Sequence, residues 1–146
     1  MRALLLALAL GAPCSAQDRC IVACDATSTG PEAADRLALH LDHPLPGGVA
    51  VVGLVEGGFQ DAFIQARLEV PAANLGRLLR DLALDPAGLA PRADEDFGPP
   101  GPAWWDPENE DGLVVGHGNL DAFASTLMGV VPGETATTVY LWAFQT

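Results

Sequence analysis

The chain of 146 residues contains no lysine, and its basic residues are few. Its seven arginines stand against 19 aspartates and glutamates, which gives a formal net charge of −12. A nucleic-acid-binding surface needs clustered basic side chains to replace the counterions of phosphates. A peripheral protein held by anionic lipids needs a similar cluster. The charge balance therefore argues against both classes, and we expect no nucleic-acid partner.

The sequence also lacks an apolar run long enough to span a bilayer, so we expect no membrane span. Its most apolar segment is short and lies at the N-terminus, where Arg2 precedes a run of Leu and Ala and the small residues before Gln17. This order is typical of a secretory signal peptide over residues 1–16. The alternative is a buried N-terminal helix. Cys14 follows Pro13, a poor fit to a lipoprotein cleavage site, so no lipid anchor is expected. The pattern predicts a soluble periplasmic or secreted protein.

Cysteine is scarce, and removal of residues 1–16 would leave only Cys20 and Cys24. Two neighbouring cysteines in an oxidising compartment indicate a disulfide. The loop that a Cys20–Cys24 disulfide closes is short, so the bridge would hold the N-terminal segment together and contribute little to stability. Two free thiols are the first alternative. A metal site is the second, but no further ligands lie nearby in the sequence.

Motifs for nucleophilic catalysis and phosphate binding are missing. There is no Gly-x-Ser-x-Gly sequence, and without lysine the glycines at 53, 57 and 58 cannot belong to a phosphate-binding loop. Residues 106–112 resemble the start of an EF-hand, but the glycine comes one place late and His117 stands where the final glutamate should be. We therefore predict no catalytic residue, no metal site and no cofactor.

Hydrophobic periodicity predicts two helices. Thr29 and Glu32 form a capping-box pattern before a helix over 31–41, although Leu37, Leu39 and Leu41 also alternate as in a strand. Leucines at 75, 78, 79 and 82 recur at helical spacing and predict a helix over 72–84.

Strands are predicted by valine-rich or alternating segments. The segment 62–70 alternates cleanly, which indicates a strand buried on one face only. Residues 120–131 fit either a helix or a strand, and the turn after them slightly favours a hairpin. The predicted strands are residues 49–56, 62–70, 113–115 and 137–145.

Together these elements predict an α+β fold. A small antiparallel sheet would be built from two hairpins, with one or two helices on one face and a long loop rich in proline and glycine. We predict three regions along the chain: the signal peptide (1–16), an N-terminal segment with a short helix (17–43), and a single α+β domain (44–146).

The long loop, residues 86–112, holds the most distinctive side chains. Trp104 and Trp105 form a candidate binding platform for a sugar or peptide, but we favour an anchoring role in which at least one indole packs near Tyr140 and Trp142. The loop also carries an acidic cluster, which we interpret as a solvated surface. Its members are Asp94, Glu95, Asp96, Asp106, Glu108, Glu110 and Asp111.

Three histidines are candidates for a metal site. His40 and His43 stand three residues apart with Asp42 between them, and His117 is distant in sequence. Residues three apart share a helix face, but Pro44 is expected to end the helix at His43. Isolated exposed histidines are the commoner arrangement.

Three parts of the sequence carry a resemblance to a group of proteins. The first is Leu45-Pro46, which precedes a predicted hairpin with Gly58-Phe59-Gln60-Asp61. The second is the strand-to-helix connection from Arg67 through Pro71 to Leu75. The third is the segment from Pro102 to Pro107, with the paired tryptophans, which is followed later by Val139 to Trp142. Over residues 44–146 the chain resembles small exported bacterial proteins of unassigned function, often lipoproteins. This resemblance implies an α+β fold and no chemistry.

The sequence supports two functional hypotheses. The first is a non-enzymatic exported protein that binds an unidentified protein or small molecule. The second is a small periplasmic hydrolase that uses a metal or paired carboxylates, for which three histidines or two acids would have to converge.

Overall fold

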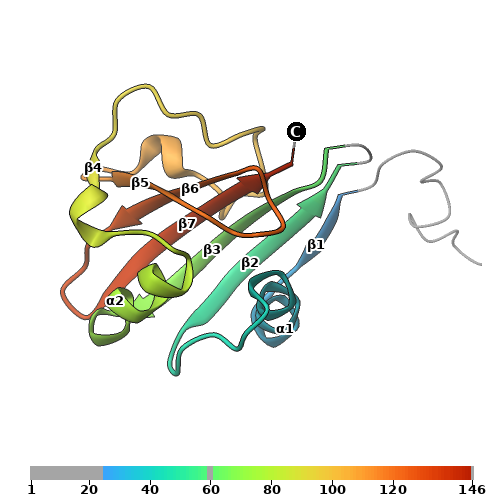
Figure 1. Ribbon diagram of the computed structural model, residues 1–146, viewed down its shortest axis with the longest axis horizontal. Helices are drawn as coiled ribbons and strands as arrows, with labels where there is room; N and C mark the ends of the chain where they lie inside the picture. The colour runs from blue at the N-terminus through green and yellow to red at the C-terminus, as the bar shows by residue number, and fades with distance from the viewer. Residues whose placement is uncertain (1–24, 59–60, 146) are drawn as a thin grey trace, which may run out of the picture.

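The computed structural model describes residues 25–58 and 61–145, which form one curved antiparallel sheet with two helices on its concave side (Figure 1). The seven strands lie in the order β1-β2-β3-β7-β6-β5-β4, and each strand is antiparallel to its neighbours. Their bounds are β1 Ala26–Ser28, β2 Ala50–Gly57, β3 Phe63–Pro71, β4 Ala90–Pro91, β5 Val114–Gly118, β6 Ser125–Val131 and β7 Ala136–Phe144.

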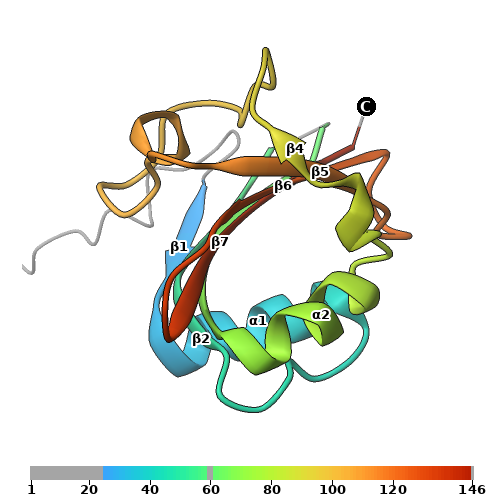
Figure 2. The same cartoon turned by 90° about the vertical axis from the view of Figure 1, so that its left-hand side faces the viewer.

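Both helices lie against the same face of the sheet, as Figure 2 shows. They are α1, Gly30–Leu41, and α2, Ala72–Asp81. We call the face that they cover the helix side and the opposite face the loop side. On the helix side, leucines of both helices pack on aliphatic side chains of β2, β3, β6 and β7. A mixed α+β fold with an antiparallel sheet is therefore confirmed.

Both predicted helices form, with small differences at their ends. In α1, Leu37 and Leu41 are buried and Leu39 is 81% exposed, so the helical spacing prevails over the alternating pattern. The second helix stops at Asp81, before the predicted end at residue 84. The chain turns there because Ala83 takes a left-handed conformation with φ of 51°.

The sheet is larger than the predicted pair of hairpins. The ambiguous segment 120–131 becomes a turn followed by β6, which pairs with β5 on one side and β7 on the other. The strand predicted at 113–115 runs instead from Val114 to Gly118. Two edge strands, β1 and β4, were not predicted at all, because three and two residues are too few to establish a period.

The predicted boundary at residue 44 does not separate two packing units. Strand β1 pairs with β2, and Ala33, Leu37 and Leu41 of α1 are buried in the helix-side core. The described part of the segment 17–43 therefore shares the sheet and the core of the larger region.

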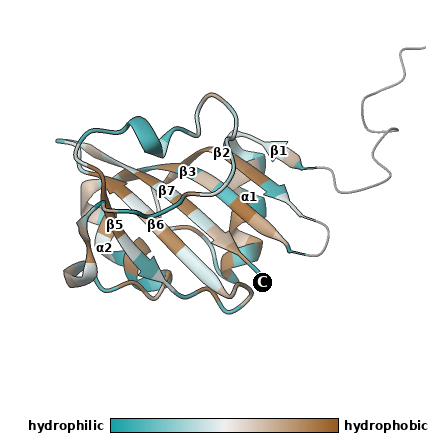
Figure 3. Cartoon of the chain, turned by 90° about the horizontal axis from the view of Figure 1, so that it is seen from above, coloured by the Kyte–Doolittle hydropathy of each residue, from teal (hydrophilic) through white to brown (hydrophobic). Residues whose placement is uncertain are grey.

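The prediction that β3 is buried on one face only is wrong. Its polar face carries Gln65, Arg67 and Glu69, and Gln65 is only 1% exposed. The long loop crosses this face and covers it fully at Gln65 and partly at Arg67, whereas the side chain of Glu69 stays 37% exposed. Central strands are therefore enclosed between helices on one side and a loop on the other, and Figure 3 shows long hydrophobic stretches along them.

Candidate functional site

The aromatic side chains are concentrated on the loop side of the sheet. All three tryptophans and the only tyrosine of the chain belong to this layer. On the helix side, Phe123 is the one buried aromatic residue in the described part of the chain. The loop-side cluster comprises Phe63, Phe97, Trp104, Trp105, Tyr140, Trp142 and Phe144, with Leu113, Val115, Leu127 and Val131.

The ring-to-ring contacts of this cluster fall into two groups. Trp105 stands at the centre of the first group, with its ring centroid 5.4 Å from that of Tyr140 and 6.4 Å from that of Trp104, both in edge-to-face orientation. Edge-to-face pairs at such distances are favourable because the positive edge of one ring meets the negative face of the other. A second group of rings lies on β3 and β7, where Trp142 packs against both Phe63 and Phe144.

Polar side chains of β3 hold the loop on this face. Gln65 donates from Nε2 to the carbonyl of Pro99 at 2.7 Å and of Phe97 at 3.5 Å. Arg67 donates to the carbonyl of Trp104 at 3.3 Å, and its guanidinium lies 5.6 Å from the centre of the Tyr140 ring. Buried carbonyls that have no partner in a regular element need donors of this kind.

The favoured interpretation of the tryptophan pair is confirmed for Trp105. Its side chain is 7% exposed and packs on Tyr140. Trp104 is half-buried and lies on β2, where a Cβ at Gly53 would come within 2.3 Å of the indole. Glycine at this position gives the ring room to lie flat against the strand, so both indoles anchor the loop.

Tyr140 connects β7 with the acidic end of the loop. It is completely buried, and its hydroxyl donates to Oε1 of Glu110 at 2.6 Å. Burial raises the pKa of Tyr140 well above its ordinary value, and the hydrogen bond to Glu110 raises it further. The hydroxyl is thus held as a neutral donor, which makes it an anchor and unsuited to act as a base near neutral pH.

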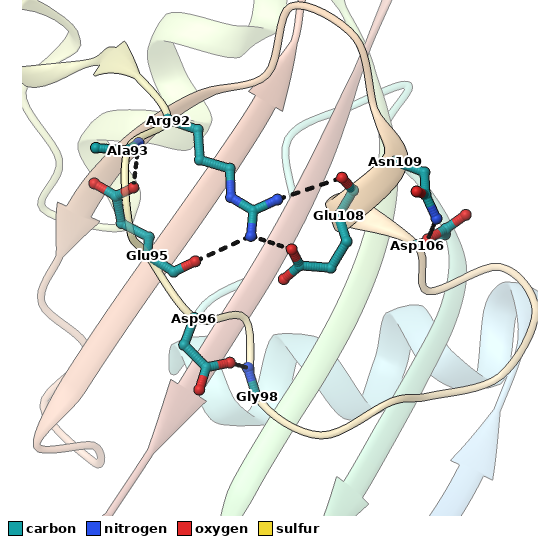
Figure 4. Close-up of polar contacts among 8 residues, drawn as sticks. All are labelled: Arg92, Ala93, Glu95, Asp96, Gly98, Asp106, Glu108 and Asn109. Carbon is teal, nitrogen blue, oxygen red and sulfur yellow. Dashed lines mark hydrogen bonds and ion pairs between the residues drawn. The ribbon is translucent and has the colours of Figure 1, made fainter.

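The acidic cluster does not form one site, as Figure 4 shows. Arg92 forms an ion pair with Glu108 and donates to the carbonyl of Glu95 at 3.2 Å. Asp96 and Asp106 instead accept hydrogen bonds from Gly98 and Asn109 within the loop. Hydrogen bonds from the backbone, chiefly that of Ala93, hold the pKa of Glu95 below its usual range. With Glu110, which accepts from Tyr140, five of the seven acidic side chains therefore fix the conformation of the loop.

Two hollows open next to the aromatic layer. The first, of about 300 Å³, lies within the loop; it is lined by residues 97–101 and 105–109. The second, of about 400 Å³, lies at the end of the sheet near the β2–β3 turn; we call it the aromatic hollow, and it is lined by Asp61, Phe63, Trp142, Phe144 and Gln145. Gly98 of the first hollow packs so closely on Trp142 of the second that a Cβ at Gly98 would lie within 2.5 Å of the indole.

The aromatic hollow is the place where rings of the loop-side cluster reach the surface. Phe63 and Phe144 are half-buried, and Trp142 between them is 8% exposed. The ring centroid of Trp142 lies 5.2 Å from that of Phe63 and 5.5 Å from that of Phe144. Open apolar hollows with a few polar groups at the rim are the usual form of small-molecule sites.

The three histidines do not converge. His40 bonds Glu56 of β2 at 2.8 Å, and His43 lies at the end of α1 with Nδ1 3.2 Å from the carbonyl oxygen of Pro44. His117 is exposed on β5, in a different part of the sheet. Within residues 25–58 and 61–145, no three side chains of His, Cys, Asp or Glu are placed as metal ligands would be.

His40 instead belongs to a structural cluster that ties α1 to the sheet. Glu56 accepts hydrogen bonds from both Arg36 and His40 of this helix. Partial burial by itself would raise the pKa of Glu56, but the two hydrogen bonds outweigh it and lower the pKa below its ordinary value. The His40 ring also packs at 5.8 Å from Phe123.

Two groups of sequence predictions lie outside the described residues. Cys20 and Cys24, with their predicted disulfide, belong to residues 1–24, and so does the predicted signal peptide over 1–16. These remain predictions. In the part of the chain that is described, no helix has the length and hydropathy needed to cross a bilayer.

Comparison of the chain with protein-family models, with curated proteins and with solved structures gives no match.

The aromatic hollow is not among the sites that the sequence predicts, although part of its signal is present there. Successive side chains of a strand point to opposite faces of the sheet. By this alternation one face of the sheet carries Phe63 of β3 together with Trp142 and Phe144 of β7. What the sequence did not show is that β3 and β7 are neighbours, with Phe63 opposite Phe144 and Gln65 opposite Trp142. That pairing joins segments about eighty residues apart and brings the three rings together.

Proposed function

We propose that this chain is an exported, non-enzymatic binding module that holds a small organic ligand in the aromatic hollow. The observation that carries the proposal is the group of three rings left partly open at one end of an otherwise covered aromatic layer. Aromatic side chains dominate binding energetics because they offer large apolar area with little conformational freedom to lose.

The surroundings of the hollow support the same proposal. Its walls are the two central strands β3 and β7, whose pairing runs without a break from Phe63–Phe144 to Pro71–Ala136. Gly98 of the long loop packs on the indole of Trp142 and holds this ring in position. A site on such a frame is already formed before the ligand arrives, which reduces the entropy lost on binding. Its volume of about 400 Å³ is sufficient for a ligand of one ring.

Binding can be tested with benzyl alcohol, a neutral probe with one ring and one hydroxyl. We expect chemical-shift changes in two-dimensional NMR spectra at Phe63, Trp142 and Phe144, with a dissociation constant on the order of a millimolar for so small a ligand. Phe63→Ala should weaken binding about tenfold. Leu39→Ala, at an exposed leucine on α1, is the matched control and should leave binding unchanged.

The proposal fails if saturating benzyl alcohol shifts no signal in the hollow. It also fails if Leu39→Ala weakens binding as much as Phe63→Ala does, because binding would then be a non-specific effect of apolar surface.

Export is the second half of the proposal and rests on residues 1–16. Mass spectrometry of protein purified from the periplasm or the medium should find a chain that begins at or near Gln17. Recovery of the chain only in the cytoplasm, with Met1 intact, would contradict export and leave the binding proposal to its own test.

A further inference from the structure

The chemistry of the aromatic hollow also indicates what kind of ligand fits it. Of the five lining residues in the described part of the chain, three present aromatic rings, and the other two are Asp61 and Gln145. The face of an aromatic ring carries negative charge in its quadrupole and attracts cations. A carboxylate at the rim adds a full negative charge.

Among the described residues that line the hollow, none carries a cationic side chain. Arg67, which also lies on the loop side of β3, is already engaged: it is 5.6 Å from the Tyr140 ring, and it bonds the Trp104 carbonyl and Glu69. Gln145 donates its amide to the carbonyl of Ala122 at 2.6 Å, which leaves its own carbonyl oxygen as an acceptor. The polar groups of the hollow are therefore negative or accepting.

The balance between rings and acceptors distinguishes two classes of cation. A primary ammonium brings three N–H donors and loses stability when they are buried without acceptors. Side-chain acceptors in the described lining belong only to Asp61 and Gln145, so the N–H donors of a primary ammonium that face the three rings would find none. A fully alkylated ammonium has no N–H, so aromatic faces and one nearby carboxylate are sufficient.

From this geometry we infer that the aromatic hollow binds a small alkylated ammonium ion, with the cationic head against Phe63, Trp142 and Phe144 and with Asp61 as the counter-charge. This inference rests on the proposed function, because it names the ligand class of the same site. The net charge of −12 favours the approach of such a cation from solution. The ligand is a free solute, since the hollow is small and its described lining residues include no basic side chain for a lipid phosphate.

The test compares choline chloride with 3,3-dimethyl-1-butanol, its neutral isostere, by NMR titration of the mature full chain. The inference predicts that choline binds about tenfold more tightly than the isostere, which is the effect expected of a partly desolvated cation–π site. Phe144→Leu keeps an apolar side chain and removes a ring face, so it should reduce the preference for choline more than it weakens binding of the isostere.

Asp61→Asn tests the counter-charge, and Asp121→Asn is its matched control. Both positions are exposed, and both substitutions remove one negative charge, but Asp121 lines a different cleft beside the C-terminal ends of the helices. We expect Asp61→Asn to weaken choline binding severalfold without affecting the isostere. Asp121→Asn should change neither the binding of choline nor that of the isostere. An equal loss in both variants would overturn the local role of Asp61.

Other outcomes separate this inference from the proposed function. Equal affinity for choline and its isostere would overturn the ammonium inference and leave the binding site in place. No binding of choline, the isostere or benzyl alcohol would overturn both. Binding to phosphatidylcholine vesicles without binding of free choline would contradict the free solute and make a lipid headgroup the ligand.

Discussion

The two faces of the central sheet are covered in different ways. On the helix side, regular elements present leucines to aliphatic side chains, and the only buried aromatic residue described there is Phe123. On the loop side, an irregular segment lies on tryptophan, tyrosine and phenylalanine, and the strand beneath it contributes Gln65 and Arg67 as hydrogen-bond donors.

Backbone hydrogen bonding explains this contrast. A helix satisfies the N–H and C=O groups of its interior residues, so it can rest on a purely apolar surface. An irregular loop satisfies only some of its own carbonyls, as that of Pro102 is by the N–H of Trp105, and each carbonyl that is buried without a donor costs free energy. The sheet therefore has to supply polar side chains wherever the loop turns its carbonyls inward. We conclude that the helix side mainly stabilises the fold, whereas the loop side also shapes a site.

The largest expected effect comes from truncating one large buried side chain on each face. Leu78→Ala in α2 and Trp105→Ala in the loop should lower the free energy of unfolding by about 2–5 and 3–5 kcal/mol, respectively. Urea denaturation measures both. If Trp105→Ala costs less than about 1 kcal/mol while Leu78→Ala has its full effect, the loop is not anchored by the indole.

Two glycines of the loop side separate backbone strain from close packing. Gly98 has φ of +79° and a Cβ there would meet Trp142, whereas Gly112 has φ of +73° and open space around it. Gly112→Ala should cost about 1 kcal/mol for the left-handed backbone alone. Gly98→Ala should cost about 1–3 kcal/mol more, because the indole must move. Equal losses in urea melts would show that the contact with Trp142 is unimportant.

The role of the polar side chains under the loop can be tested at Gln65. Gln65→Met keeps the size of the side chain but removes the donor to the carbonyls of Pro99 and Phe97. Burial of these carbonyls without a partner should cost about 1–3 kcal/mol. An unchanged midpoint in urea would mean that the hydrogen bonds contribute nothing, and the proposed difference between the faces would lose its physical basis.

The smallest effect is expected on the helix side, at the attachment of α1 through Glu56. Its folded pKa lies below the ordinary value, so the contribution to stability is present above about pH 5 and is lost as the pH falls through the lowered pKa. Glu56→Gln should therefore cost about 1 kcal/mol at neutral pH and less in acid. Stability measured between pH 3 and 7 checks this, and an equal loss at both ends would contradict the assigned pKa shift.

Particular residues show how much of this structure could be predicted from the sequence. Leucines at helical spacing and the alternation of 62–70 identified both helices and β3, because local periodicity reports which face is buried. The same alternation misled us about Gln65, Arg67 and Glu69. A polar face is expected to meet water, and only tertiary structure shows that a loop some thirty residues further along covers it.

The candidate site was predicted even less completely. Trp104 and Trp105 were singled out because adjacent indoles are conspicuous in a sequence, and the structure shows both packed on the sheet. The hollow of Phe63, Trp142 and Phe144 depends on the pairing of β3 with β7. Single-sequence periodicity contains no information about which strands become neighbours.

The most direct test of the division between the two faces uses two positions on β7. Leu141 points to the helix side and Phe144 to the aromatic hollow. We predict that Leu141→Ala lowers the free energy of unfolding by about 2–5 kcal/mol but leaves the dissociation constant of benzyl alcohol, measured by NMR titration, unchanged. Phe144→Ala should cost only about 1 kcal/mol and weaken binding about tenfold. Unchanged binding in Phe144→Ala, or lost binding in a folded Leu141→Ala, would contradict the account.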